Sequence, residues 1–251
     1  MHLDLNITNK KDITRALNQQ GFCWVNGAVL GEISSLTSID FSNFTSYWED
    51  LVEDQFLKDL GRYRFRRHSS YVVSGGKSEL MPHRAHWQSL DYNALHGGIK
   101  RMFEPIDPVL NASSKWLKLI AEIPSLFLDQ NSHPGQDKDL TKEWFTEAHQ
   151  FRINTFGGIG RPTPEGAHRD GVDYVALILV NRKFIKGGET RIFNIDGNEG
   201  LRFTLDEPWS MLLIDDHRII HETTPIQDNG GSGFRDTLVL TYRKGEFQQS
   251  K

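Results

Sequence analysis

The second half of the chain is a succession of short apolar or alternating segments separated by turn residues. Residues 174–180, YVALILV, are almost continuously apolar, which is typical of a strand buried on both faces. Residues 148–155 alternate instead, so one face of that strand is expected to look into the interior of the fold. Such a series of short strands and turns predicts a double-sheet jelly roll, a double-stranded β-helix. The predicted strands are 148–155, 174–180, 189–193, 201–205, 210–214, 219–222 and 236–243.

Three segments of the first half carry apolar residues at helical spacing, so the expected class is mainly β with flanking helices (α+β). The middle helix has acidic residues that we interpret as a solvated face: Glu49, Asp50, Glu53 and Asp54. The helical segments are 12–20, stopped by Gly21 and followed by a strand at 22–25, then 43–60, and then 112–128, broken near Pro124. Residues 129–140 are polar with Pro and Gly and predict a surface loop.

The composition narrows the classes of partner. A formal charge of −4, with both signs mixed along the chain, argues against a nucleic-acid partner. The one cysteine, Cys23, excludes an internal disulfide and a Cys-rich zinc site, and we interpret it as a small buried residue. No apolar run reaches the roughly 20 residues that span a bilayer, so no membrane partner is expected. The N-terminal residues lack the pattern of a secretory signal, so a cytoplasmic location is expected.

Three residues of the strand-rich half predict one metal site. His168 and Asp170 are two positions apart, and residues at that spacing on a strand point to the same face. His221 completes the set if the chain folds back. Two imidazoles and one carboxylate leave the opposite face of a metal open, which suits non-haem iron(II) better than a four-ligand structural zinc site.

Arg235 and Thr237 share a face of the last predicted strand by the same period of two. A guanidinium beside a hydroxyl is a good receptor for a carboxylate, because arginine offers a planar fork of donors. Each of these residues alone is more often a structural or solvated one. It is their order along the chain that makes the pattern specific.

That order, His-x-Asp, a distal His and then Arg-x-Thr, resembles the iron(II)- and 2-oxoglutarate-dependent dioxygenases. The chain is similar in particular to the bacterial family that includes the L-isoleucine dioxygenases, which hydroxylate free aliphatic amino acids. The matching stretches run from about residue 61 to residue 244 and include PTPEGAHRDGVDYV, DDHRIIHETTPI and FRDTLVLTYRK.

The resemblance implies that His168, Asp170 and His221 ligate iron and form the catalytic centre. It implies that Arg235, with Thr237, binds the far carboxylate of 2-oxoglutarate. The implied cofactors are iron(II), 2-oxoglutarate and dioxygen, with ascorbate as a reductant in assays. Related halogenases lack the carboxylate ligand, so Asp170 favours hydroxylation of a free L-amino acid. We expect a single domain, in which residues 1–143 are mainly helical and form a substrate lid, and residues 144–251 form the catalytic jelly roll.

Substrate contacts are expected from four residues: Arg64, Arg66, His86 and Gln150. If GRYRFRR is a strand, its arginines share one face and either cover a solvated edge or hold the carboxylate of an amino acid. His83 and His86 have no third ligand nearby in the sequence, so packing or substrate contact is expected for them rather than metal binding.

Other interpretations remain open from the sequence. His217 and His221 are four apart, as in a helical zinc pair, but the strand-like flanks favour a loop for His217. Asp215 and Asp216 are interpreted as solvated turn residues, the alternative being support of a metal ligand. The competing functions are a non-catalytic metal-binding jelly roll and an oxygenase acting on another small molecule or on a protein.

Overall fold

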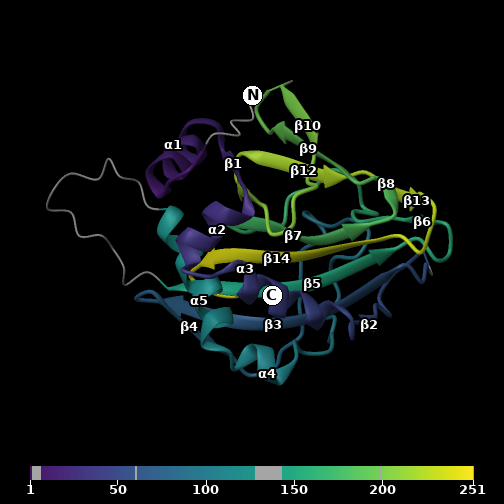
Figure 1. Cartoon of the computed structure of the whole chain (residues 1–251), viewed down its shortest axis with the longest axis horizontal. Coiled ribbons are helices and arrows are strands. Elements are labelled where there is room, and N and C mark those ends of the chain that lie inside the picture. Colours follow the sequence, from purple (N-terminus) through teal and green to yellow (C-terminus); the bar gives the residue numbers. More distant parts are fainter. Residues whose placement is uncertain (2–6, 60, 128–142, 198, 251) are drawn as a thin grey trace, which may run out of the picture.

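The fold is built on one large antiparallel sheet (Figure 1). A computed structural model describes residues 1, 7–59, 61–127, 143–197 and 199–250. The strand order in the large sheet is β1-β11-β7-β14-β5-β3-β2, and β4 pairs with β3. Its strands are β1 Phe22–Val25, β2 Val52–Glu53, β3 Arg64–Ser74, β4 Lys77–Leu80, β5 Trp144–Asn154, β7 Tyr174–Lys183, β11 Met211–Asp215 and β14 Phe234–Lys244.

Two three-stranded sheets complete the β architecture. One has the order β10-β9-β12 and the other β6-β13-β8. An apolar core joins the first of them to the large sheet, because Ile192 and Ile219 pack in the same cluster as Leu177 and Leu212. Their strands are β6 Ile159–Gly160, β8 Ile185–Gly187, β9 Glu189–Asn194, β10 Gly200–Thr204, β12 Ile219–Thr223 and β13 Ile226–Asp228. The mainly β, jelly-roll fold with flanking helices is confirmed.

The helices cover the other face of the large sheet (Figure 1). Phe41 and Trp116 from two of these helices share a core with Ile178 and Leu240 of the sheet. The helices are α1 Lys10–Gln20, α2 Gly27–Ser34, α3 Ser38–Thr45, α4 Pro108–Asn111 and α5 Ser114–Glu122, with short 3-10 turns η1 Ser46–Trp48 and η2 Ile123–Leu126. Within the described residues, no helix combines the length and apolar character needed to cross a bilayer.

Alternation along strand β14 divides the interior in two. Leu238, Leu240 and Tyr242 are fully buried and pack toward the helices. The intervening side chains, among them Arg235 and Thr237, line a cavity on the opposite face. Because successive side chains of a strand point to opposite faces, the same strand stabilises the helical layer and supplies the polar lining of the cavity.

Most elements begin and end near the positions that the pattern predicts. The expected helix at 12–20 is α1, and its C-cap Gly21 adopts φ of 80°, a left-handed conformation that glycine adopts without strain. The strand at 22–25 is β1. The helix at 112–128 is shorter, because α5 changes to a 3-10 turn at Ile123 and Pro124. The predicted loop at 129–140 lies outside the described residues.

The predicted helix at 43–60 is wrong. Helix α3 ends at Thr45, and the chain continues through η1 into β2, which pairs with β3. The expected solvated face is also wrong for Asp54, whose carboxylate is buried and accepts a hydrogen bond from Arg64 Nε at 2.8 Å. This tertiary pairing outweighs the local helical spacing, which is a weak determinant.

Candidate metal centre and cavity

His168 and His221 are held opposite each other by the backbone. The His168 N–H donates to the His221 carbonyl at 3.0 Å, and the His221 N–H donates back at 2.9 Å. Their imidazole centroids are 4.6 Å apart. His221 lies on β12, so the predicted assignment of this histidine to a strand is confirmed. His217 lies in the preceding turn with an exposed side chain, as expected.

Asp170 joins the two imidazoles. Its carboxylate oxygens are 3.8 Å from His168 Nε2 and 3.7 Å from His221 Nε2. One ligand atom from each of the three side chains lies within 4.8 Å of the others, an arrangement that is able to hold a metal ion. The structure therefore brings together the three residues that the sequence singled out.

Hydrogen bonding and burial shape the protonation of these groups. Burial lowers the pKa of His168, but the Asp170 and Glu165 carboxylates outweigh it and raise that pKa above its usual value. His168 Nδ1 lies 2.9 Å from the Gly166 carbonyl and donates to it, which leaves the Nε2 lone pair free for an ion. Burial lowers the pKa of His221 well below its usual value, and the nearby His168 adds to the effect. Burial raises the pKa of Asp170 to about 6 despite the opposing effect of His168. A bound cation would offset the energetic cost of burying this carboxylate, because it would compensate the negative charge.

Asp216 fixes the loop that carries Asp170. Its carboxylate accepts backbone N–H bonds from Asp170 at 2.9 Å, Gly171 at 2.8 Å and Val172 at 3.1 Å. Only 1% of Asp216 is exposed, so the prediction of a solvated turn residue is wrong. Asp215 is half-buried, and its carboxylate accepts only the His217 N–H among the described side-chain hydrogen bonds.

A cavity of about 120 Å³ adjoins the triad and runs along the polar face of the large sheet. It is lined by side chains of β3, β5, β7, β12 and β14 and by the segments around residues 86–101 and 162–172. His168, Asp170 and His221 all belong to its wall. The open face of the triad therefore looks onto a space that a small molecule is able to enter.

Arg235 reaches this cavity from β14 and is 2% exposed. Its Nε and one terminal nitrogen have no hydrogen-bond partner among the described residues. Burial lowers the pKa of Arg235 to about 10, so the guanidinium still carries its charge near neutral pH. Thr237 lines the same cavity. A buried, charged and unpartnered guanidinium is costly unless an anion joins it, so this pair fits a carboxylate.

Two of the arginines near the start of β3 also reach the cavity. Arg64 and Arg66 are 5% and 3% exposed and line its wall, whereas the Arg62 side chain is exposed and pairs with Glu53. Arg101, from a segment that the sequence did not single out, is a fourth buried guanidinium in the wall, beside those of Arg235, Arg64 and Arg66. The strand period identifies Arg64 and Arg66, but nothing local to Arg101 distinguishes it from a surface arginine.

The other two predicted substrate contacts, His86 and Gln150, have different positions. His86 lines the cavity, but Gln150 does not. On β5 the side chains that reach the cavity are Glu147, His149, Phe151 and Ile153, so Gln150 lies on the other face of the strand and its expected role is corrected. The sequence indicated the alternation but not which face looked inward.

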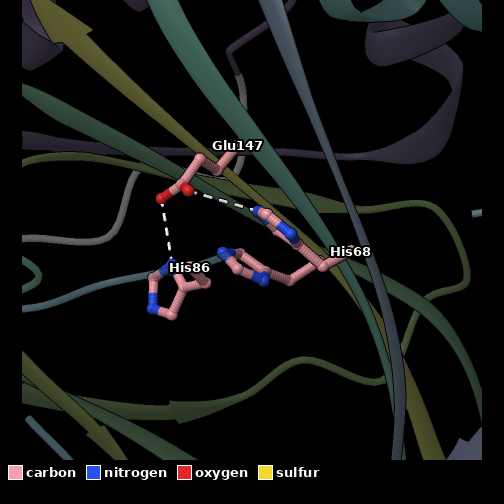
Figure 2. Close-up of side chains that lie close together, drawn as sticks. His68, His86 and Glu147 are labelled. Carbon is pink, nitrogen blue, oxygen red and sulfur yellow. Dashed lines mark hydrogen bonds and ion pairs between the residues drawn. The ribbon is translucent and has the colours of Figure 1, made fainter. Parts of the chain in front are cut away.

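A second cluster of titratable side chains borders the cavity, and the sequence did not predict it. Glu147 lies 3.2 Å from His68 Nε2 and 3.0 Å from His86 Nδ1 (Figure 2). His149 stacks on His68 with ring centroids 4.7 Å apart. The four residues of this cluster come from β3, β5 and the segment after β4. They meet only because His68 on β3 pairs with His149 on β5.

A model of the 2OG-Fe dioxygenase family matches residues 45–241. A crystal structure of a bsmA homolog from Methylobium petroleophilum PM1 is 43% identical, with a TM-score of 0.88 and coverage of 99% of each chain. No curated protein matches the sequence significantly. Fold, site and family model agree, and the chain belongs to the 2OG-Fe dioxygenase family.

Two more distant structures share the fold. IDO from Bacillus thuringiensis is 19% identical with a TM-score of 0.73, and covers 95% of this chain and 100% of its own. The Fe(II)/α-ketoglutarate-dependent dioxygenase TqaL is 15% identical with a TM-score of 0.67, and covers 96% and 91%. Membership of the family makes the protein an oxygenase whose cofactors are iron(II), 2-oxoglutarate and dioxygen.

Proposed function

We propose that the protein hydroxylates an unactivated C–H bond of a free L-amino acid, with an aliphatic substrate such as isoleucine or leucine preferred. His168, Asp170 and His221 would hold the iron. The observation that carries the proposal is the convergence of this triad on a cavity whose wall also contains several buried guanidinium groups. Bound iron, with 2-oxoglutarate and dioxygen, supplies the oxidising power for such a reaction.

The residues of the chain supply binding, orientation and exclusion of water. Arg235 and Thr237 are assigned to the far carboxylate of 2-oxoglutarate, because the Arg235 guanidinium is buried beside the triad without a described partner. A side chain at Gly188 would also approach Arg235, since a Cβ there would lie 3.6 Å from Arg235 Cδ.

The substrate end of the cavity favours an anion. Arg66 Nε and Arg101 Nε are buried and have no hydrogen-bond partner within the described chain. Arg66 is partly neutralised, because one of its terminal nitrogens lies 3.7 Å from the Asp54 carboxylate. We assign the α-carboxylate of the substrate to these arginines, with Arg64 contributing to the same wall.

Asp170 favours hydroxylation over halogenation, because it would supply the carboxylate ligand that the related halogenases lack. Succinate and carbon dioxide would then be the co-products. The segment between residues 86 and 101, which contributes to the cavity wall, is the element we assign to covering the substrate.

The test is a screen of the free L-amino acids with the purified protein, iron(II), ascorbate and 2-oxoglutarate. Succinate release is measured together with the mass of the amino-acid product. We expect one or a few aliphatic amino acids to gain the mass of one oxygen atom with stoichiometric succinate. Succinate release that no amino acid stimulates, with no oxygenated amino acid in any reaction, would contradict the proposal.

A further inference from the structure

The cluster of His68, His86, Glu147 and His149 is not used by the chemistry assigned above. Glu147 is 6% exposed, at the wall of the cavity. Its two oxygens are each approached by one imidazole nitrogen, that of His68 at 3.2 Å and that of His86 at 3.0 Å (Figure 2). A buried carboxylate held by two histidines on the surface of a substrate cavity requires an explanation.

The hydrogen bonds fix which atoms donate. Burial tends to raise the pKa of Glu147, but His86 and His68 outweigh it and hold the pKa below its usual value, so the group is a carboxylate that only accepts. His86 Nδ1 and His68 Nε2 are therefore the donors. Burial lowers the pKa of His86 to about 4, so this imidazole is neutral and its Nε2 carries a lone pair.

The same reasoning applies to His149 and weighs against a metal. Arg66 donates to His149 Nδ1 at 2.7 Å, because a guanidinium has no acceptor. The neutral His149 ring then carries its proton on Nε2, where a metal ligand needs a lone pair. The four side chains do bring ligand atoms within 4.8 Å of one another. However, Arg66 contacts the cluster, and Arg84 lies 3.8 Å from Glu147, so a divalent cation would meet neighbouring positive charge.

A singly charged cation that donates hydrogen bonds fits this cluster better. Glu147 has lone pairs beyond the two that the histidines use, and His86 Nε2 is an acceptor from a side chain that borders the cavity. An ammonium group has three N–H donors and one charge. The unpartnered nitrogens of Arg66 and Arg101 lie in the same wall and suit a carboxylate. The Glu147 carboxylate and the two arginines together match the ammonium and carboxylate groups of a zwitterionic amino acid.

We propose that Glu147 and His86 bind the α-ammonium group of the substrate, and that His68 and His149 are positioning residues that hold this pair in place. The inference rests on the proposed function, and it defines the substrate class more closely: a free amino acid with an unmodified amino group. N-acylated amino acids and the corresponding des-amino acids would be poor substrates, because they leave the buried carboxylate without its partner.

The experiment compares two substrates in three variants. The substrates are the free amino acid most active in the screen and its des-amino carboxylic acid, which keeps the carbon skeleton. The variants are Glu147→Gln, His86→Asn and the control Glu79→Gln, whose side chain is exposed on β4. In His86→Asn the asparagine amide is able to donate to Glu147 in place of His86 Nδ1, but the variant lacks the acceptor that His86 Nε2 provides.

We expect Glu147→Gln to raise the KM of the amino acid about tenfold or more, the usual scale for one charge-assisted hydrogen bond. The ratio of kcat/KM for the amino acid to that for the des-amino acid should fall by a similar factor in both cluster variants and stay constant in Glu79→Gln. A merely structural role would lower both kcat/KM values together and leave their ratio unchanged. Calorimetric binding of the amino acid without oxygen supplies a readout that is independent of turnover.

The outcomes separate the inference from the function on which it rests. If the wild-type protein oxygenates no free amino acid, the proposed function fails and the inference fails with it. If it does so and the substrate ratio is unchanged in His86→Asn, the ammonium assignment alone is overturned. A second equivalent of iron or zinc, bound by the wild type and lost in Glu147→Gln, would overturn it in favour of a metal. If Glu147→Gln does not fold, His86→Asn decides the test.

Discussion

At the scale of single residues, Arg235 combines burial, positive charge and missing partners. Its Nε and one terminal nitrogen are unpaired within the described residues, and its side chain lines the cavity beside the triad. Leaving a buried hydrogen-bond donor unpaired costs on the order of 1–3 kcal/mol of stability, and more when the donor is charged. The missing partner is therefore best explained as the carboxylate of the co-substrate.

Replacing Arg235 with alanine should raise the 2-oxoglutarate concentration needed for half-maximal succinate release by about tenfold or more, because a charged hydrogen-bonded pair contributes about 1.5–3 kcal/mol. The measurement is succinate release over a range of 2-oxoglutarate concentrations. Arg202→Ala, an exposed arginine on β10, is the matched control and should leave the requirement unchanged. An unchanged requirement in Arg235→Ala would remove this residue from the co-substrate site.

Replacing Asp170 with alanine should abolish hydroxylation and weaken iron binding, because it removes the carboxylate that lies between the two imidazoles. Iron retained after gel filtration and product mass are measured together. The control is Asp196→Ala, an exposed aspartate in the turn after β9. Near-normal turnover by Asp170→Ala would refute its assignment as a ligand.

At the scale of elements, the loop between β6 and β7 depends on one carboxylate from the turn before β12. Asp216 accepts three consecutive backbone N–H groups, those of residues 170, 171 and 172. Such support of a ligand-bearing segment typically changes metal affinity by about 10–100-fold when it is lost. Asp216→Ala should therefore weaken iron binding by roughly that factor.

The neighbouring Asp215→Ala is the control for this prediction, since the Asp215 carboxylate accepts a single turn N–H in the described structure. Iron affinity is measured by competition with a chelator in both variants. Equal iron affinity for Asp216→Ala and the wild type would show that the loop holds Asp170 without this brace.

The elements also show what the sequence was able to predict. The pair of Arg235 and Thr237 can be identified locally, because strand geometry sets which face they share. The strand expected for His168 and Asp170 did not form: His168 lies in an isolated bridge and Asp170 in the loop that Asp216 holds, so only their spacing in the sequence pointed to the site. The Glu147 cluster cannot be identified locally, since its histidines meet only through the register of β3 against β5. The helix expected at 43–60 failed for a similar reason, as the pairing of β2 with β3 and the capture of Asp54 by Arg64 are long-range interactions.

At the scale of the whole molecule, the buried imidazoles should make stability depend on pH. Burial is the largest cause that lowers the pKa of His68, His86 and His149, and that of His86 falls to about 4 from a usual 6.5. Between these two values the unfolded chain binds a proton at His86 that the folded chain does not. The contribution of His86 to stability is therefore complete above about pH 6.5 and is lost as the pH falls toward 4.

We expect the buried His86 to lower the free energy of unfolding of the metal-free protein as the pH falls through this window, by about 1.4 kcal/mol per pH unit for the extra proton bound by the unfolded state. Asp170 and Asp236, whose pKa values burial raises to about 6, contribute in the opposite direction, so the test is the difference between variants. Urea unfolding at a series of pH values measures it. The His86→Asn variant should show a shallower dependence of the unfolding free energy on pH. The control is His83→Asn, which replaces an exposed histidine and should show the same dependence as the wild type. Identical slopes in all three proteins would contradict a neutral, buried His86.

The central claim is that one ion and one 2-oxoglutarate bind at His168, Asp170, His221 and Arg235. Anaerobic calorimetric titration of the metal-free protein, first with iron(II) and then with 2-oxoglutarate, tests it most directly. We predict one equivalent of each, with iron binding lost in His221→Ala and 2-oxoglutarate binding weakened in Arg235→Ala. Full binding of both by these two variants, or the absence of iron binding by the wild-type protein, would contradict it.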